Sequence, residues 1–207
     1  SVLLAALVLA VAVVVGISAF VSRLQAALES ESLRFLAADI VLSSSRDIPT
    51  PWIERARSDG LSVAQTLGFP SMVFAGDDAM YLASVKAVSA EYPLRGALLI
   101  SDDAFGPVGE VQRVPGVGEA WLAPRLFTLL NATVGDEVTV GKRKLRVTGA
   151  IRSEPDSSSA MFGYGPRLLM NIADIPATGV IQPGSRVDWR LLLRGNDEQL
   201  ERYVQYV

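Results

Sequence analysis

The sequence contains no cysteine and no histidine among its 207 residues. Without them the chain cannot form a disulfide, a Cys-His or Ser-His-Asp catalytic group, a redox CxxC pair or one of the usual zinc sites. It also lacks a surplus of positive charge, because 19 Lys and Arg stand against 22 Asp and Glu, giving a net charge of −3. Nucleic-acid binding usually requires a basic surplus to neutralise phosphates. We therefore expect no nucleic-acid partner.

Nucleotide-binding motifs are missing as well. The segment Gly135–Arg143 ends in Gly-Lys, but five residues separate its glycines where a phosphate loop has four. Arg143 also stands where Ser or Thr would hold magnesium. Gly116 and Gly118 lack the third glycine of a dinucleotide fingerprint, because Trp121 occupies that neighbourhood. We predict a hairpin turn at Gly135–Arg143 and no bound cofactor, so that any ATP is bound by another chain.

Three pairs of carboxylates are candidates for acid–base chemistry or cation binding. Each pair lies beside turn-forming residues, and neighbouring side chains in a turn or strand usually point apart. The pair that flanks Pro155 falls in a segment rich in Ser, Gly and Pro, which we predict to be a mobile loop. We assign these pairs to solvated turns: Asp77 with Asp78, Asp102 with Asp103, and Glu154 with Asp156.

The serine clusters at 43–45 and 157–159 have no nearby base and no Gly-x-Ser-x-Gly elbow, so they are interpreted as linkers. We predict no catalytic, cofactor-binding or metal-binding residue, and therefore no enzymatic activity in this chain. One alternative is that Met161, Phe162 and Tyr164, in a Gly-rich loop, present an apolar surface to a lipid-like cargo or a partner.

A long uncharged run opens the chain. The twenty residues Val2–Val21 carry no charge, and the first charged residue is Arg23. A helix of twenty residues is about 30 Å long, the thickness of the hydrocarbon core of a bilayer. The alternatives are a signal peptide, whose apolar region has about 7–15 residues, and a buried core helix, which normally has a polar stripe. We predict a transmembrane helix over 1–22, in a sequence that is part of a longer protein.

The helical period of apolar residues continues beyond the run, with Leu24, Leu28, Leu36 and Ile40 interspersed with charges. This pattern predicts an amphipathic stalk helix over 23–42 that ends near the serines at 43–45. The stalk and its linker therefore occupy residues 23–45.

Residues 46–207 alternate irregularly between helical and strand patterns, which indicates an α+β domain with a β-rich subdomain. With the transmembrane helix and stalk before it, this is the predicted fold class. Asn196 is placed to cap a final helix. Predicted helices cover 52–58 and 123–131 and begin at 196; predicted strands cover 62–75, 80–89, 96–100, 167–172 and 186–194, with a hairpin over 134–151 and loops over 102–118 and 153–166.

Several strings resemble a known family along essentially the whole chain. ALVLAVAVVVGISAFVSRLQAALE and EAWLAPRLFTLLNATVGDEVTVG are similar to the N-terminal part of bacterial FtsX-like and MacB-like permeases of ABC transporters. ATGVIQPGSR is more specific to the YbbP-type members. The resemblance implies a longer permease of the bacterial inner membrane, in which 46–207 form a periplasmic MacB-like core domain and further transmembrane helices follow.

The resemblance also implies partners and a function. The expected partners are membrane lipid, a separate ABC ATPase subunit of the YbbA type, and a periplasmic esterase or lysophospholipase. ATP hydrolysis in the ATPase would move the periplasmic domain, which acts on a lipid-like or other hydrophobic compound. The alternative is a singly anchored periplasmic binding or scaffolding module without an ATPase.

Overall fold

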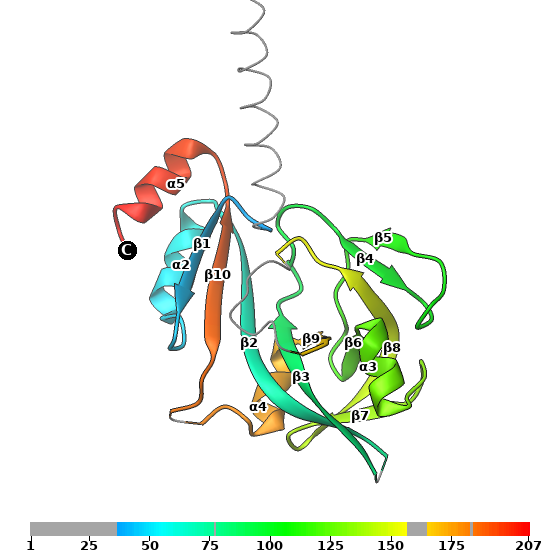
Figure 1. The fold of residues 1–207 in the computed structure, drawn as a ribbon. Helices are drawn as coiled ribbons and strands as arrows, with labels where there is room; N and C mark the ends of the chain where they lie inside the picture. The colour runs from blue at the N-terminus through cyan, green and yellow to red at the C-terminus, as the bar shows by residue number, and fades with distance from the viewer. Residues whose placement is uncertain (1–36, 77, 157–164, 183) are drawn as a thin grey trace, which may run out of the picture.

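The computed structural model describes residues 37–76, 78–156, 165–182 and 184–207 (Figure 1). The predicted transmembrane helix, and the predicted stalk as far as residue 36, lie outside the described residues. No helix in the described part combines the length and the apolar character that a membrane crossing needs. The elements are β1 (Ile40–Ser44), α2 (Thr50–Ser58), β2 (Ser62–Ala75), β3 (Ala79–Val88), β4 (Leu98–Ser101), β5 (Gly109–Val111), β6 (Glu119–Leu122), α3 (Pro124–Leu130), β7 (Glu137–Val140), β8 (Arg143–Ser153), β9 (Arg167–Asn171), a 3₁₀ turn (Ile172–Asp174), α4 (Ile175–Thr178), β10 (Asp188–Arg194) and α5 (Asp197–Val204).

The central feature is a ring of strands that closes on itself. Hydrogen bonding runs from β2 through β3, β9, β6 and β8 to β7, and β7 pairs with β2 again. β10 and β1 extend the sheet outward from β2, while β4 and β5 extend it from β8. Closure satisfies backbone groups that an open sheet would leave at its edges.

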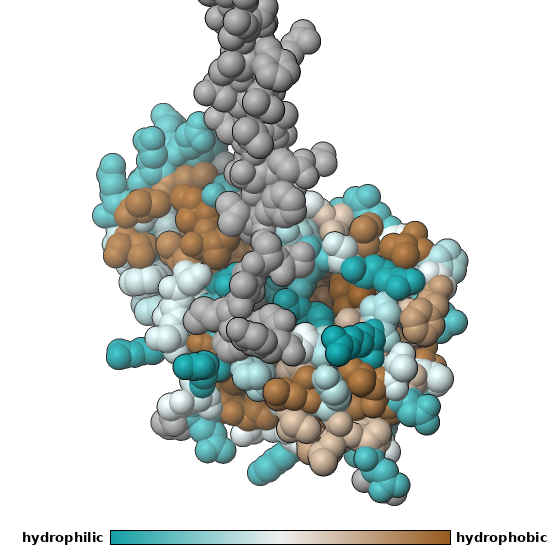
Figure 2. Space-filling view, viewed as in Figure 1, coloured by the Kyte–Doolittle hydropathy of each residue, from teal (hydrophilic) through white to brown (hydrophobic). Residues whose placement is uncertain are grey.

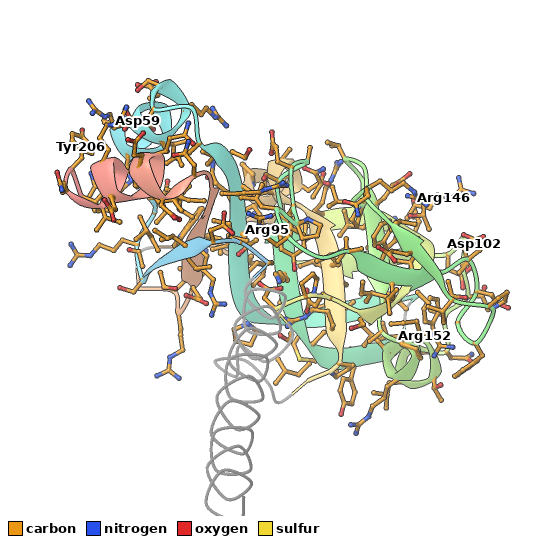
Figure 3. The ribbon with its side chains drawn as sticks, turned by 90° about the horizontal axis from the view of Figure 1, so that it is seen from above. Asp59, Arg95, Asp102, Arg146, Arg152 and Tyr206 are labelled. Atoms are coloured by element: carbon orange, nitrogen blue, oxygen red, sulfur yellow. The ribbon has the colours of Figure 1, made fainter. Side chains whose placement is uncertain are left out.

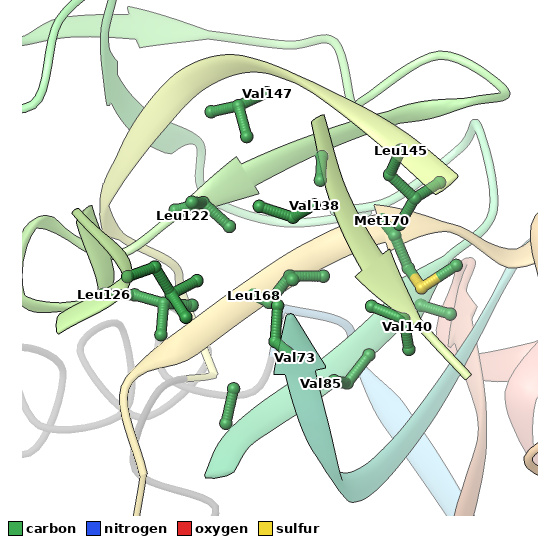
Figure 4. Packing of buried hydrophobic residues seen from close by; sticks show 14 of the residues in the cluster. Val73, Val85, Leu122, Leu126, Val138, Val140, Leu145, Val147, Leu168 and Met170 are labelled. Carbon is green, nitrogen blue, oxygen red and sulfur yellow. The ribbon is translucent and has the colours of Figure 1, made fainter. Parts of the chain in front are cut away.

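The interior of the ring is apolar because its strands alternate. Val138 and Val140 of β7 and Leu145 and Val147 of β8 are fully buried, with more exposed residues between them. They meet side chains from the other ring strands and from α3 in one cluster (Figure 4). Full burial of each such side chain contributes roughly 1.5–3 kcal/mol, so this cluster is the main apolar contribution to stability.

β2 is long because it belongs to two parts of the sheet. Along one edge it pairs with β10 over 62–68 and with β7 over 73–75. Pro70 lies between these stretches, where neither partner strand is paired to that edge. A proline has no backbone N–H, so it is tolerated where a ladder hydrogen bond is not required.

Two helices cover the outer extension of the sheet. Ile53 and Ala56 of α2 and Tyr203 of α5 pack against Leu191 and Leu193 of β10. The Tyr203 hydroxyl donates a 3.0 Å hydrogen bond to the carbonyl of Trp52, which joins the two helices. The intervening Leu192 faces a different cluster on the other side of the sheet, which explains why three consecutive leucines are buried.

Most predicted elements are confirmed. The hairpin β2–β3, the hairpin β7–β8 and the strands β9 and β10 lie within one to three residues of the predicted boundaries. α3 ends at Asn131, which adopts the left-handed conformation typical of a helix C-terminus. α5 begins after Asn196, whose side chain forms a capping box with Gln199 as the sequence pattern indicates. Local signals of turn and cap chemistry were therefore sufficient for these elements.

Two expectations are wrong, and one strand was missed. The stalk helix does not extend through residue 42, because Ile40–Ser44 form β1 and pair with β10 after a left-handed residue at Ala37. The predicted loop 102–118 contains the short strand β5. The strand β6, between β8 and β9, was not predicted, because Ala120 and Leu122 are buried on one face of the sheet and Trp121 on the other, so the strand shows no alternation. In each case, pairing with a distant strand decides the conformation.

The turn of the β7–β8 hairpin gives a direct test of packing. Gly141 has φ +58°, and a Cβ there would lie 2.2 Å from the carbonyl oxygen of Thr178. Gly76 has the same φ with nothing within 4 Å. We predict that Gly76→Ala costs about 1–2 kcal/mol of backbone strain, and that Gly141→Ala costs about 1–3 kcal/mol more from overpacking. Urea titration followed by tryptophan fluorescence measures both; equal losses would contradict the structure.

Candidate functional site

A cluster of buried charges lies where β3, β8 and β9 meet. The Lys86 ammonium group lies 2.9 Å from Glu154 Oε2 and 2.5 Å from Asp156 Oδ1, and it donates to the Tyr92 hydroxyl at 2.9 Å. Tyr92 in turn donates to Asp156. Arg167 Nε lies 2.6 Å from Glu154 Oε1. We call Lys86, Tyr92, Glu154, Asp156 and Arg167 the ionic cluster.

The ionic cluster is balanced, with two positive and two negative groups. Burial by itself would raise the pKa of Asp156, but Lys86 and the hydrogen bonds from Lys86 and Tyr92 hold that pKa below its usual value. Burial, together with the charges of Asp156 and Glu154, raises the pKa of Tyr92 well above its usual value. Tyr92 therefore remains a protonated hydrogen-bond donor at neutral pH.

The ionic cluster corrects the interpretation of Glu154 and Asp156 as solvated turn residues in a mobile loop. Both are buried, with 5% of each residue exposed. The local sequence could not show this, because their partner Lys86 lies 68 and 70 positions away. Lys86 itself could have indicated the cluster, because it is the one charged residue in the largely apolar strand segment ASVKAV.

A second group of contacts fastens the segment 37–39, where the described chain begins. The Arg95 guanidinium binds Asp39 with two hydrogen bonds of 2.8 and 3.0 Å, and the Arg95 backbone N–H donates to the carbonyl of Ala37. The Asp39 N–H donates to the carbonyl of Leu193, and Asp39 Oδ2 accepts from the N–H of Gly195. We call this group of contacts the junction; Figure 3 labels Arg95 beside the start of β1.

The electrostatics of the junction differ from those of the ionic cluster. Partial burial would raise the pKa of Asp39, but hydrogen bonds from Arg95 and Gly195 and the charges of Arg95 and Arg194 lower it. The Arg95 side chain is 40% exposed. An ion pair so open to water contributes about 1 kcal/mol or less, so the junction is chiefly a positional constraint.

The remaining sequence candidates are dispersed. Asp78, Asp102 and Asp103 are exposed in turns, and Figure 3 shows Asp102 far from Arg95. The hairpin predicted at Gly135–Arg143 is confirmed, and Arg143 pairs with the buried Asp174 at 2.7 Å. Within the described part of the chain, no three acidic side chains lie together in a way that could hold a metal ion. The candidates outside the described residues are Asp77, the serines at 157–159, Met161, Phe162 and Tyr164.

The buried Asp174 joins Gly118 to the β7–β8 hairpin. Its Oδ2 atom accepts a 2.7 Å hydrogen bond from the N–H of Gly118, which has φ +83°. Its Oδ1 atom accepts from Arg143. Of the glycines that resembled fragments of nucleotide motifs, Gly118 therefore binds a buried carboxylate of this chain, and Gly116 donates to Glu119.

Comparison with known proteins decides the family. The model of the MacB-like periplasmic core domain matches residues 2–198. The chain belongs to the MacB-like periplasmic core domain family. It is 42% identical over 202 residues to the uncharacterized ABC transporter permease YbbP of Escherichia coli (strain K12), covering 98% of this chain and 24% of YbbP. The chain thus spans about a quarter of the length of this relative.

Solved structures agree on the fold. The periplasmic region of MacB from Actinobacillus actinomycetemcomitans has a TM-score of 0.52 at 13% identity and covers 85% of each chain. The extracellular domain of the noncanonic ABC-type transporter YknZ from Gram-positive bacteria has a TM-score of 0.52 at 10% identity, over 79% of this chain and 86% of that one. The mixed α/β architecture of this MacB-like domain is therefore shared at low sequence identity.

Removing the central cation tests the ionic cluster. We predict that Lys86→Met lowers the free energy of unfolding by about 3–5 kcal/mol, because two buried carboxylates lose their shared partner. The matched control is Lys144→Met, since Lys144 is 72% exposed and pairs with Glu137 at 3.6 Å. Lys144→Met should lower the free energy of unfolding by less than about 1 kcal/mol. Chemical denaturation measures both; similar losses would contradict the assigned role of Lys86.

Acid should weaken the same cluster in a defined window. Because the pKa of folded Asp156 is lowered, its contribution to stability is complete above the unfolded pKa of about 3.9 and disappears as the pH falls through the lower folded pKa. We predict that Asp156→Asn is clearly less stable than the unsubstituted chain near neutral pH, and that the gap narrows below about pH 4. Denaturation midpoints of both chains, taken from neutral pH to below pH 4, measure this difference in stability. A gap independent of pH would contradict the prediction.

Proposed function

We propose that this MacB-like chain is part of the permease subunit of an ABC transporter in the bacterial inner membrane, with the described domain in the periplasm. A separate ATPase of the YbbA type binds ATP, and its hydrolysis displaces the domain. Three observations support the proposal: the family membership, the uncharged run Val2–Val21, and the absence of a nucleotide-binding motif from the sequence.

The junction is the observation that carries the proposal furthest. Residues 37–39 lie inside the range predicted for the stalk, 23–42, and are held from two sides, by Arg95 and by the end of β10. Contacts in several directions resist both sliding and rotation of this segment. A displacement of the stalk would therefore be passed to the sheet through Asp39 and its partners, and would not be absorbed by a flexible linker.

The proposed cargo is a lipid-like or other hydrophobic compound. The supporting feature is the outer face of the β2–β3 hairpin, where two adjacent cross-strand pairs are exposed: Met72 with Leu82, and Phe74 with Met80. Their exposed fractions run from 38% to 61%. Figure 2 shows apolar surface over this hairpin, at the end of the domain opposite β1's first residue. Methionine-rich apolar surfaces adapt to varied ligands.

Association with an ATPase tests the function. We expect the full-length permease to co-purify with the ATPase encoded beside it and to stimulate ATP hydrolysis. A periplasmic esterase or lysophospholipase is included in the proposed assembly and would appear in the same preparation. Failure of the permease to associate with any ATPase would overturn the proposal in favour of a singly anchored binding or scaffolding module.

The junction is tested in the assembled transporter. This chain has no cysteine, so Val117→Cys places a dye site on an exposed residue of the described domain once any cysteines in the rest of the permease and in the ATPase are replaced. We predict that ATP changes energy transfer from this dye to labelled lipid, and that Arg95→Gln reduces the change at least about twofold while ATP binding is retained. The matched control is Arg55→Gln, whose partner Asp59 lies one helical turn away. An unaltered response in Arg95→Gln would show that the junction does not transmit displacement.

A further inference from the structure

A polar groove of about 360 Å³ lies beside the junction. It is open to solvent, and its size falls within the range of about 300–1,000 Å³ that is typical of small-molecule sites. Its polar lining comes from four separate segments of the chain. The side chains that matter for binding are Ser62, Glu91, Arg95, Gln112 and Arg194, with Leu94 at the wall.

The charged side chains of the groove have hydrogen-bonding capacity left over. Arg95 uses Nε and one terminal nitrogen on Asp39, and Arg194 uses one terminal nitrogen on the carbonyl of Leu94 at 3.1 Å. Among the described residues, Arg194 forms no salt bridge, although its charge acts on the nearby Asp39, and Glu91 has neither an ion pair nor a hydrogen bond. Each arginine therefore keeps N–H donors available to a ligand.

The arrangement of opposite charges defines the ligand. Glu91 lines the same groove as Arg95 and Arg194, yet no ion pair joins it to either of them. A carboxylate and guanidinium groups that share a groove without contact can be bridged by a molecule that carries both signs of charge. Guanidinium groups suit phosphate oxygens, which they bind through paired N–H donors.

We propose that this groove binds a zwitterion that joins a phosphate to an ammonium group, as in a phosphoethanolamine unit. The phosphate contacts Arg194 and the remaining donors of Arg95, and the ammonium group contacts Glu91. Gln112 and Ser62 supply neutral hydrogen bonds. The chemistry is common to a free small molecule and to a lipid headgroup, and nothing in the site depends on an ATPase.

The probe for the free molecule is glycerophosphoethanolamine, titrated into the full chain in a maltoside detergent and followed by calorimetry. Glycerophosphate and ethanolamine serve as half-ligands. We expect the zwitterion to bind at least about tenfold more tightly than either half. Arg194→Gln should weaken the binding of glycerophosphoethanolamine about tenfold. Glu91→Gln should make the chain bind glycerophosphoethanolamine no more tightly than glycerophosphate. Both residues are exposed, and thermal unfolding verifies that the variants fold.

The control is Arg146→Gln, because Arg146 is exposed and lies well away from Arg95 (Figure 3). The Arg146→Gln variant should bind glycerophosphoethanolamine as tightly as the unsubstituted chain does. A second experiment compares nanodiscs of ethanolamine phospholipids with nanodiscs of glycerol phospholipids as competitors of the probe. If only the ethanolamine phospholipids displace the probe, the natural ligand of the groove is a lipid headgroup. If neither lipid displaces it, the natural ligand is a free small molecule. The proposed site would be overturned if the probe did not bind. It would also be overturned if Arg194→Gln and Glu91→Gln bound the probe as tightly as the unsubstituted chain. Either result could occur while the ATPase associates normally, so it would not count against the proposed function.

Discussion

A single buried ammonium group holds together segments that are far apart in the chain. Lys86 stands on β3 and is satisfied by carboxylates that follow β8, while Arg167 at the start of β9 completes the charge balance. Burying three charges beside the partly buried Arg167 is costly, and the cost is offset only if every group keeps its partners. The ionic cluster therefore fixes the ends of β3, β8 and β9 in one relative position.

The ionic cluster and the junction are connected by four consecutive residues. Tyr92 belongs to the cluster, Leu94 accepts a hydrogen bond from Arg194, and Arg95 binds Asp39. Tyr92 and Leu94 are also buried in the same apolar cluster as Ala37. The segment that enters the domain is therefore tied through residues 92–95 to the ring of strands, so that the domain can follow a motion of that segment as a unit.

Sequence patterns were sufficient where the cause of the structure is local. Asn131 and Asn196 reveal helix ends through conformation and capping, and alternation in EVTV and RKLRV reveals the β7–β8 hairpin. They were insufficient for β1, whose apolar residues fit a helical period equally well until β10 is known to lie beside it. The ionic cluster and the groove are harder still, because their residues come from segments far apart in the chain, from Ser62 to Arg194 in the groove.

Arg95 shows how weak and strong constraints combine. Its ion pair with Asp39 is open to water and contributes little energy, but its backbone N–H is bonded to Ala37 and its neighbours are buried. The backbone therefore stays in place while the guanidinium group can exchange partners at small cost. A guanidinium group that lies between Asp39 and a polar groove can serve both at once: Asp39 takes Nε and one terminal nitrogen, and the remaining N–H donors face an anion without displacing the contact that fixes the segment entering the domain.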